Sequence, residues 1–264
     1  MSTLVFFHAH PDDEAIATGG TMAQAADAGH RVVLVVATKG EHGEVPDGFL
    51  DPGEPLWRRR VHETEQSAAI LRAARVEFLG YADSGMMGEA RNDAPGSFWS
   101  AKVEEAAQRL ATILREERAD VLTVYDDHGG YGHPDHIQVH RVGVRAAEMV
   151  ETPRVYEATI DRDAVTELAT EHPEGLPDGT DAPDLEAIKE LGVPGAEITT
   201  RVDVGDVLDR KRAAMRAHAS QISETSWFLA LPPDVYAAMF GTEWFIRRGE
   251  RPAVPETSLL GEAR

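Results

Sequence analysis

Residues 8–14, HAHPDDE, place two histidines and three consecutive acids directly behind the apolar run TLVFF. His10 and Asp13 lie three residues apart where the chain is expected to turn from strand into helix, so both side chains can face one point. Carboxylates and imidazoles packed at the end of a buried strand repel or desolvate one another unless a cation lies among them. Neither this segment nor residues 125–136 contains lysine or arginine. The neutralising cation is therefore predicted to be a metal ion.

A second pair of histidines occurs in residues 125–136, YDDHGGYGHPDH. His133 and His136 have the same three-residue separation, and the proline between them favours the start of a helix. From spacing alone, either histidine can complete a metal site with His10 and Asp13.

The types of these side chains indicate which metal they bind. Imidazole together with carboxylate suits zinc or a neighbouring first-row metal, whereas magnesium and calcium prefer oxygen ligands alone. Two histidines and one aspartate leave a coordination position open for water, as in a catalytic zinc site. Asp12 is adjacent to the ligand Asp13 but directed elsewhere, so it is free to take a proton from that water. The predicted chemistry is hydrolysis.

The elements that must position these residues alternate between strands and helices. Strands are predicted at 3–9, 31–38, 76–81, 120–126, 154–160 and 197–204, and helices at 13–29, 57–74, 101–119 and 134–150. This alternation predicts an α/β fold, with a mostly parallel sheet covered by helices on both faces. Ligands of such sheets bind beyond the carboxyl ends of the strands, where the strand order reverses. The two histidine-containing segments should meet there.

The chain is predicted to form a single domain over 1–264, an α/β unit with a C-terminal elaboration. Residues 161–195 are rich in acids, proline and glycine and are expected to form an insertion or a lid. Residues 250–264 are expected to form a flexible tail.

Composition excludes several classes of function. A formal net charge of −20 argues against nucleic acid or an anionic membrane as a partner, because both need basic patches. The absence of cysteine excludes disulfides and thiolate ligands. No apolar run approaches the length of a membrane span, and no leader peptide is evident, so a cytoplasmic location is expected. A homo-oligomer is left open.

Four motifs in order connect the chain to a known family. They are AHPDDE at 9–14, GEHGEV at 40–45, DSGM at 83–86 and GGYGHPDH at 129–136. On these motifs the chain resembles the PIG-L/LmbE-like family of zinc-dependent de-N-acetylases, particularly the actinobacterial mycothiol-pathway branch. The resemblance implies a Rossmann-like sheet and Zn²⁺ as the cofactor. From the ligand types, Fe²⁺ is the alternative metal in the cell.

The resemblance also implies roles for individual residues. It implies that His10, Asp13 and His136 bind the zinc, which selects His136 over His133. Asp12 matches the general base of the family. His133 matches a cationic group, and Tyr131 a mobile donor, both facing the oxyanion that develops during amide hydrolysis.

Three further residues are expected at the site. Arg60 and Asp83 match positions where the sugar-inositol branch contacts its substrate, although the loops differ in length. Asp135 is expected to keep His133 charged through a carboxylate contact.

The predicted function is therefore removal of an N-acetyl group from an N-acetylglucosaminyl substrate, with N-acetylglucosaminyl-inositol as the candidate. The alternatives are a mycothiol S-conjugate amidase and a non-catalytic sugar-binding module; retention of Asp12, which metal binding does not require, disfavours the module. A dinucleotide-binding enzyme is disfavoured because HPDDE stands where a glycine-rich loop would be needed. The expected partner is a small N-acetylated amino sugar.

Other polar residues near the motifs have ordinary structural interpretations beside functional ones. His8 is expected to pack or to support the site from behind. His140, Asp126 and Glu14 are each either partners of ligands or structural groups. Glu41 and Glu44 are either groups at the rim of the pocket or solvated loop acids, and the second interpretation is favoured.

Overall fold

The computed structural model describes residues 1–171, 185–249 and 251–260. Its centre is a seven-stranded sheet in the order β3-β2-β1-β4-β5-β7-β6. The strands are β1 (Thr3–His8), β2 (Arg31–Val36), β3 (Arg75–Phe78), β4 (Val121–Tyr125), β5 (Arg154–Thr159), β6 (Thr200–Asp203) and β7 (Thr242–Arg247). The first five strands in chain order pair in parallel, while β7 is antiparallel to both β5 and β6. The predicted α/β fold with a mostly parallel sheet is confirmed.

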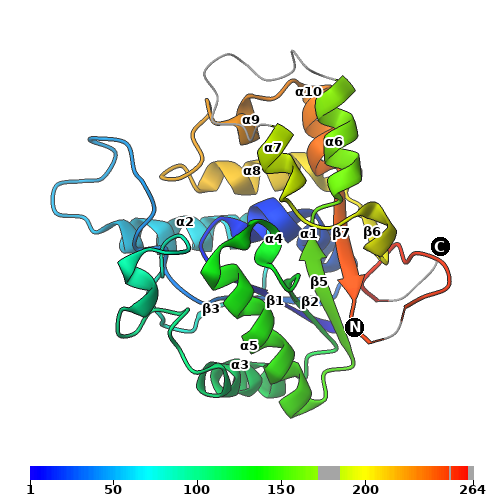
Figure 1. The fold of residues 1–264 in the computed structure, drawn as a ribbon, viewed down its shortest axis with the longest axis horizontal. Helices are drawn as coiled ribbons and strands as arrows, with labels where there is room; N and C mark the ends of the chain where they lie inside the picture. The colour runs from blue at the N-terminus through cyan, green and yellow to red at the C-terminus, as the bar shows by residue number, and fades with distance from the viewer. Residues whose placement is uncertain (172–184, 250, 261–264) are drawn as a thin grey trace.

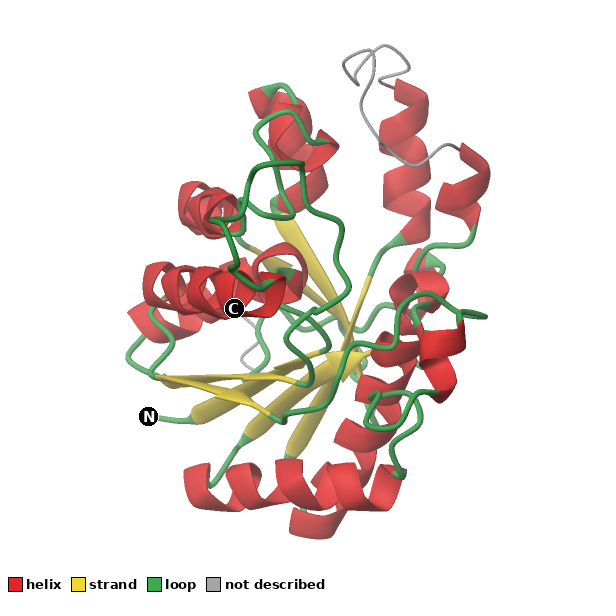
Figure 2. Cartoon of the chain, turned by 90° about the vertical axis from the view of Figure 1, so that its left-hand side faces the viewer, coloured by secondary structure: helices red, strands yellow, loops and turns green. Residues whose placement is uncertain are grey.

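Helices cover both faces of this sheet (Figure 1, Figure 2). The longer ones are α1 (Gly19–Asp27), α2 (Leu56–Leu71), α3 (Val103–Glu117), α5 (Pro134–Val150), α6 (Arg162–Glu171), α8 (Leu208–Ala217) and α10 (Pro233–Phe240). Alternate residues of β1 explain the two layers. Phe6 belongs to an apolar core with residues of α1, α2, α8 and α10, whereas Phe7 belongs to a second core with residues of α3 and α5. The central strands β1, β2 and β4 are buried on both faces, as their continuous apolar sequences require.

The main differences from the predicted elements lie near the ends of the chain. The strand β7 was not predicted, and it adds an antiparallel edge to the sheet together with β6. The first predicted helix, 13–29, consists of a π-helical turn, Glu14–Thr18, followed by α1. Single π-helical turns are frequent at functional sites.

The predicted tail contains an ordered contact with the sheet. Within 251–260, Glu256 and Leu259 are buried. The Glu256 backbone accepts a hydrogen bond from Arg201 and donates one to Thr199. This part of the segment therefore packs as an extra edge beside β6, contrary to the expected flexible tail. Residues 250 and 261–264 lie outside the described residues.

The predicted insertion, 161–195, contains α6 and the short helix α7 (Leu185–Lys189). Its ends meet in a bridge between Asp161 and Val193. Residues 172–184 of the segment lie outside the described residues. Within the described part of the chain, no helix combines the length and the apolar character needed to cross a membrane.

A buried carboxylate joins the amino-terminal ends of two strands to α3. The Arg31 guanidinium donates to both carboxylate oxygens of Glu117, at 2.5 and 3.0 Å, and Arg75 donates to the same carboxylate at 2.9 Å. These hydrogen bonds lower the pKa of Glu117 to about 2. Because the folded pKa lies below the unfolded value, the contact contributes stability above about pH 4.5 and loses it as the pH falls towards 2.

We expect Glu117→Gln to lower the free energy of unfolding at pH 7 by about 1–2 kcal/mol, because charge-assisted hydrogen bonds are lost while both arginines remain partly solvated. Urea unfolding of both proteins at pH 7 and pH 3.5 tests this. The difference between them should be smaller at the lower pH. An equal difference at both pH values would show that the contribution of Glu117 is not ionic.

Candidate active site

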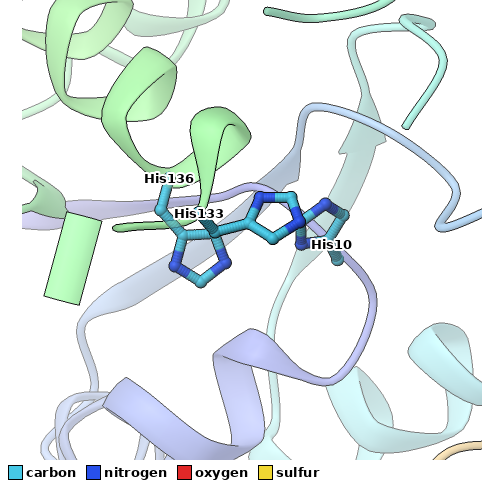
Figure 3. A group of neighbouring side chains, drawn as sticks. All are labelled: His10, His133 and His136. Atoms are coloured by element: carbon cyan, nitrogen blue, oxygen red, sulfur yellow. The ribbon is translucent and has the colours of Figure 1, made fainter. Parts of the chain in front are cut away.

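The two histidine-containing segments meet at the carboxyl ends of β1 and β4, which are neighbours in the sheet. His10 follows β1, and His133 and His136 flank the start of α5. Figure 3 shows the three imidazoles converging, and each offers a nitrogen within 4.8 Å of those of the other two. The strand order reverses at β1, so the site occupies the position expected for ligands of parallel sheets.

Asp13 lies between two of these histidines. Its Oδ2 is 3.4 Å from His10 Nδ1 and 3.5 Å from His136 Nε2. Burial disfavours the charged carboxylate, but the neighbouring His136 and His10 hold the pKa of Asp13 well below its usual range. The carboxylate is therefore ionised and oriented towards both rings.

His136 Nε2 is buried and has no hydrogen-bond partner among the residues that the structure describes. An unpaired buried nitrogen costs about 1–3 kcal/mol, so folded proteins rarely retain one without a function. Together with Asp13 Oδ2 and His10 Nδ1, this nitrogen forms a set of two imidazoles and one carboxylate, which fits a catalytic zinc site. The residues present therefore fit the metal that the sequence implies.

Asp135 orients His10, whereas the sequence suggested that its carboxylate would contact His133. Asp135 Oδ2 is 3.2 Å from His10 Nε2, and Ser84 donates hydrogen bonds to the same carboxylate from its backbone (2.9 Å) and hydroxyl (2.5 Å). A carboxylate that accepts from the far nitrogen of an imidazole leaves the near nitrogen, here Nδ1, free to bind a metal.

The structure contradicts a cationic His133. Its Nδ1 accepts a hydrogen bond of 3.1 Å from the Asp135 backbone, so the proton of the neutral ring resides on Nε2. Burial and the neighbouring His10 and His136 lower the pKa of His133 to about 3. The ring is neutral and can donate through Nε2–H.

Tyr131 lies over the site in the turn α4 (Gly129–Gly132). Its ring centroid is 5.0 Å from that of His136 and 6.1 Å from that of His133, and 47% of the residue is exposed. Burial of the hydroxyl end and the charge of Asp13 raise the pKa of Tyr131, so the hydroxyl remains a donor. The turn approaches α5 so closely that a Cβ on Gly129 would lie 2.7 Å from the Cβ of His136.

Asp12 has a backbone φ of 92°, a region that costs a non-glycine residue about 1–3 kcal/mol. Burial raises the pKa of its carboxyl to about 6, although the charge of Arg60 opposes this. Arg60 Nη2 donates to Asp12 Oδ2 at 3.1 Å and to the Pro11 carbonyl at 2.6 Å, and Nη1 donates to Gly40 O at 2.9 Å. Asp12 is thus a half-buried carboxyl group held in an uncommon conformation.

Arg60 is 4% exposed and its polar contacts are with Asp12 and the backbone. The structure therefore places it behind the predicted base, whereas the sequence placed it against the substrate. It also supplies a cation to the acid cluster from α2, which lies far outside both histidine-containing segments. A metal bound there would therefore be one of several positive partners of these acids.

Asp83 lies on the other side of His10. Its Oδ1 is 3.7 Å from His10 Nε2 and accepts a hydrogen bond of 2.9 Å from Gly85 N. Although burial opposes ionisation, His10 holds the pKa of Asp83 well below its usual range. Its carboxylate is ionised and lies buried beside His10.

His218, which follows α8, was not singled out by the sequence analysis. Its Nε2 is 2.6 Å from Glu14 Oε1, and both side chains are completely buried. A lone histidine more than 80 residues beyond the second motif carries no spacing signal that could have revealed this contact.

The remaining polar residues have structural contacts. His8 forms hydrogen bonds with the Tyr125 hydroxyl (2.8 Å) and Thr18 (2.9 Å), and Tyr125 stacks on His136, so His8 supports the site from behind.

His140 forms a hydrogen bond with the Tyr125 carbonyl, away from the histidine cluster. Asp126 Oδ1 accepts from Gly130 N, which fixes the turn that carries Tyr131.

A cavity of about 730 Å³ opens from the site. Asp12, Asp13, Tyr131 and His136 line one end. The walls beyond them are largely apolar and come from the segment that follows β5, from α6, α7, the short helix α9 (Trp227–Ala230) and its following residue, α10 and β7; they include Ile160, Leu168, Ile188, Trp227, Phe228, Leu231, Met239, Phe240 and Trp244. The volume suits a disaccharide-sized ligand.

Comparison with known families and sequences gives consistent matches. The family described as PIG-L, GlcNAc-PI de-N-acetylase, matches residues 5–147. A protein of Acidothermus cellulolyticus named 1D-myo-inositol 2-acetamido-2-deoxy-alpha-D-glucopyranoside deacetylase is 42% identical over 259 residues, covering 93% of this chain and 88% of its own. A protein of the same name from Thermomonospora curvata is 41% identical, with 92% and 89% covered.

Solved structures show the same fold at lower identity. The N,N'-diacetylchitobiose deacetylase of Pyrococcus horikoshii has a TM-score of 0.61 and 21% identity, with 93% of this chain and 83% of that chain covered. The zinc-inhibited form of teicoplanin deacetylase has a TM-score of 0.61 and 17% identity, with 94% and 100% covered. A 4-carboxy-2-hydroxymuconate hydratase from Pseudomonas putida has a TM-score of 0.60 at 20% identity, with 96% and 98% covered. The fold by itself therefore does not specify the reaction.

Proposed function

Because the chain belongs to the PIG-L family of GlcNAc-PI de-N-acetylases, we propose that it is a zinc-dependent hydrolase that removes the N-acetyl group of N-acetylglucosaminyl-inositol. The observation that carries the proposal is the buried Nε2 of His136 beside Asp13, which has no hydrogen-bond partner among the described residues, with the half-buried carboxyl group of Asp12 adjacent to them. The names of relatives that are about 40% identical over most of this chain support the substrate.

His10, Asp13 and His136 would hold the metal. When bound, it supplies positive charge that polarises the amide carbonyl and makes water a usable nucleophile near neutral pH. Fe²⁺ suits the same ligands and is the alternative in the cell.

Asp12 acts as the general base in this proposal. Its raised pKa, about 6, keeps the carboxylate ionised at neutral pH while making it more basic than an exposed aspartate. It takes a proton from the attacking water and returns that proton to the departing amine. Arg60 restrains the carboxylate through its contact with Oδ2.

Two neutral donors face the developing oxyanion. The lowered pKa of His133 describes the loss of a proton from its cationic ring, so at neutral pH the neutral ring keeps its proton on Nε2. The pKa of Tyr131 is raised, so its hydroxyl also keeps its proton. Donors preorganised in this way contribute about 3 kcal/mol each in comparable sites. Asp83, at the other side of His10, is proposed to accept hydrogen bonds from sugar hydroxyls.

A mycothiol S-conjugate amidase is the second candidate. The apolar walls of the cavity favour it, because a substrate that carries an apolar substituent would bury it there. The same metal and base would serve both reactions, since each hydrolyses an amide.

We expect the purified, zinc-loaded protein to release acetate from N-acetylglucosaminyl-inositol with a kcat/KM at least about tenfold above that for N-acetylglucosamine, because contacts beyond the reacting amide add to transition-state binding. A panel with diacetylchitobiose and a mycothiol-bimane amide tests this. Preferential cleavage of the cysteinyl amide would assign the protein to the conjugate amidases. Absence of turnover with every member would contradict both assignments.

A further inference from the structure

The predicted base depends on a backbone conformation that needs support. Asp12 has φ 92°, and its backbone N–H donates to Glu14 Oε2 at 3.1 Å. Its carbonyl accepts from Ala15 N and Ile16 N in the π-helical turn. The direction of the Asp12 side chain is therefore tied to the position of the Glu14 carboxylate.

Glu14 is held in turn by two buried donors. The Ser67 hydroxyl from α2 donates to Glu14 Oε1 at 2.5 Å, and His218 Nε2 lies 2.6 Å from the same oxygen. Each of these three residues is 0% exposed. His218 Nδ1 is buried without a partner among the described residues, so the contact with Glu14 is the hydrogen bond that the ring makes there.

The three consecutive acids thus have separate partners. The histidines of the metal site face Asp13, Arg60 contacts Asp12, and His218 contacts Glu14. Without a donor at His218, the buried Glu14 carboxylate would lose one of its two side-chain hydrogen bonds. A buried charge is costly when its hydrogen bonds are incomplete, so Glu14 would be driven to rotate and release the Asp12 backbone.

We propose that His218 is a positioning residue for the base: through Glu14 it fixes the Asp12 backbone so that the Asp12 carboxylate faces the reacting water. This role rests on the proposed hydrolase function. It assigns a catalytic task to the C-terminal part of the chain, which contributes no predicted metal ligand.

The test compares two substitutions of His218 in the full-length, zinc-loaded protein. In His218→Gln the amide nitrogen can replace Nε2 as a donor to Glu14, whereas His218→Leu keeps side-chain volume without a donor. With N-acetylglucosaminyl-inositol, we expect His218→Leu to lower kcat by about 10- to 100-fold, the scale of a misplaced catalytic group. KM should change by less than about threefold, and metal stoichiometry should be unchanged, because ground-state binding and ligands are retained. His218→Gln should recover kcat to within about threefold of the wild type.

Ser220→Ala is the matched control. Ser220 lies in the same buried segment and donates to Glu63 at 2.6 Å, without contact to Glu14. It should lower thermal stability but leave kcat unchanged. An equal fall of kcat in Ser220→Ala and His218→Leu would show that His218 is merely structural and would overturn the proposal.

A double-mutant cycle tests the route through Glu14. If His218 acts through Glu14, the double variant Glu14→Gln/His218→Leu should have nearly the same kcat as the slower of the two single variants. Multiplicative losses would mean that the two residues act independently and would overturn the proposal.

A crystal structure of each variant gives a readout that is independent of turnover. Asp12 should leave its positive φ in His218→Leu and keep it in His218→Gln; an unchanged Asp12 in both variants would overturn the proposal. If the wild type turns over no member of the substrate panel, the function fails, and the Asp12 conformation still decides the role of His218.

Discussion

Replacing Asp12 by asparagine is expected to lower kcat by at least about 10²-fold, the usual contribution of a general base. Asparagine is the appropriate substitution because it removes the charge yet tolerates the positive φ of 92° better than other non-glycine residues. Metal stoichiometry should stay at the wild-type value, since His10, Asp13 and His136 are untouched. Steady-state acetate release and elemental analysis of the same sample measure both quantities.

Asp12→Ala provides the control for the backbone. It removes the same carboxylate but suits the positive φ less well, so it should be less stable than Asp12→Asn while showing a similar loss of kcat. If Asp12→Asn instead loses metal and retains its rate per bound metal, Asp12 is a ligand and the assigned base is wrong.

Replacing His136 by glutamine is expected to abolish stoichiometric metal binding and to reduce turnover by more than about 10²-fold, because a site with three protein ligands loses one of them. Without metal, the free energy of unfolding of His136→Gln should lie within about 1 kcal/mol of that of the wild type. The reason is that Nε2 of His136 makes no hydrogen bond with the described residues. Added zinc should raise Tm in the wild type only, because a ligand stabilises the state that binds it.

His140→Gln is the matched control, a histidine one turn further along α5. Its Nδ1 contacts the Tyr125 carbonyl and lies outside the histidine cluster, so its metal content and zinc-dependent Tm shift should remain. Equal metal binding by His136→Gln and the wild type would place the metal elsewhere.

Local sequence carries much of the information about the site. His10 and Asp13 are three residues apart across the turn that follows β1, and His136 lies in the first turn of α5. Such short spacings fix relative direction within one element. The alternation of strands and helices then determines the parallel sheet that brings the carboxyl ends of β1 and β4 together.

Partners far apart in the chain were decided by tertiary packing. Arg60 was expected at the substrate and instead holds Asp12. Asp135 was expected at His133 and instead bonds to His10. In each case the side chain has several neighbours within reach, and only the packed structure selects one.

The sequence by itself determined the residue types at the metal site and the sheet that gathers them, because both follow from periodicity and short-range spacing. The tertiary structure alone decided the neutral state of His133, the conformation of Asp12 and the contact between Glu14 and His218. Protonation depends on burial and on every charge nearby. The Glu14–His218 contact joins residues 204 positions apart, and no local pattern encodes it, because it forms only when α8 packs beside the turn that follows β1.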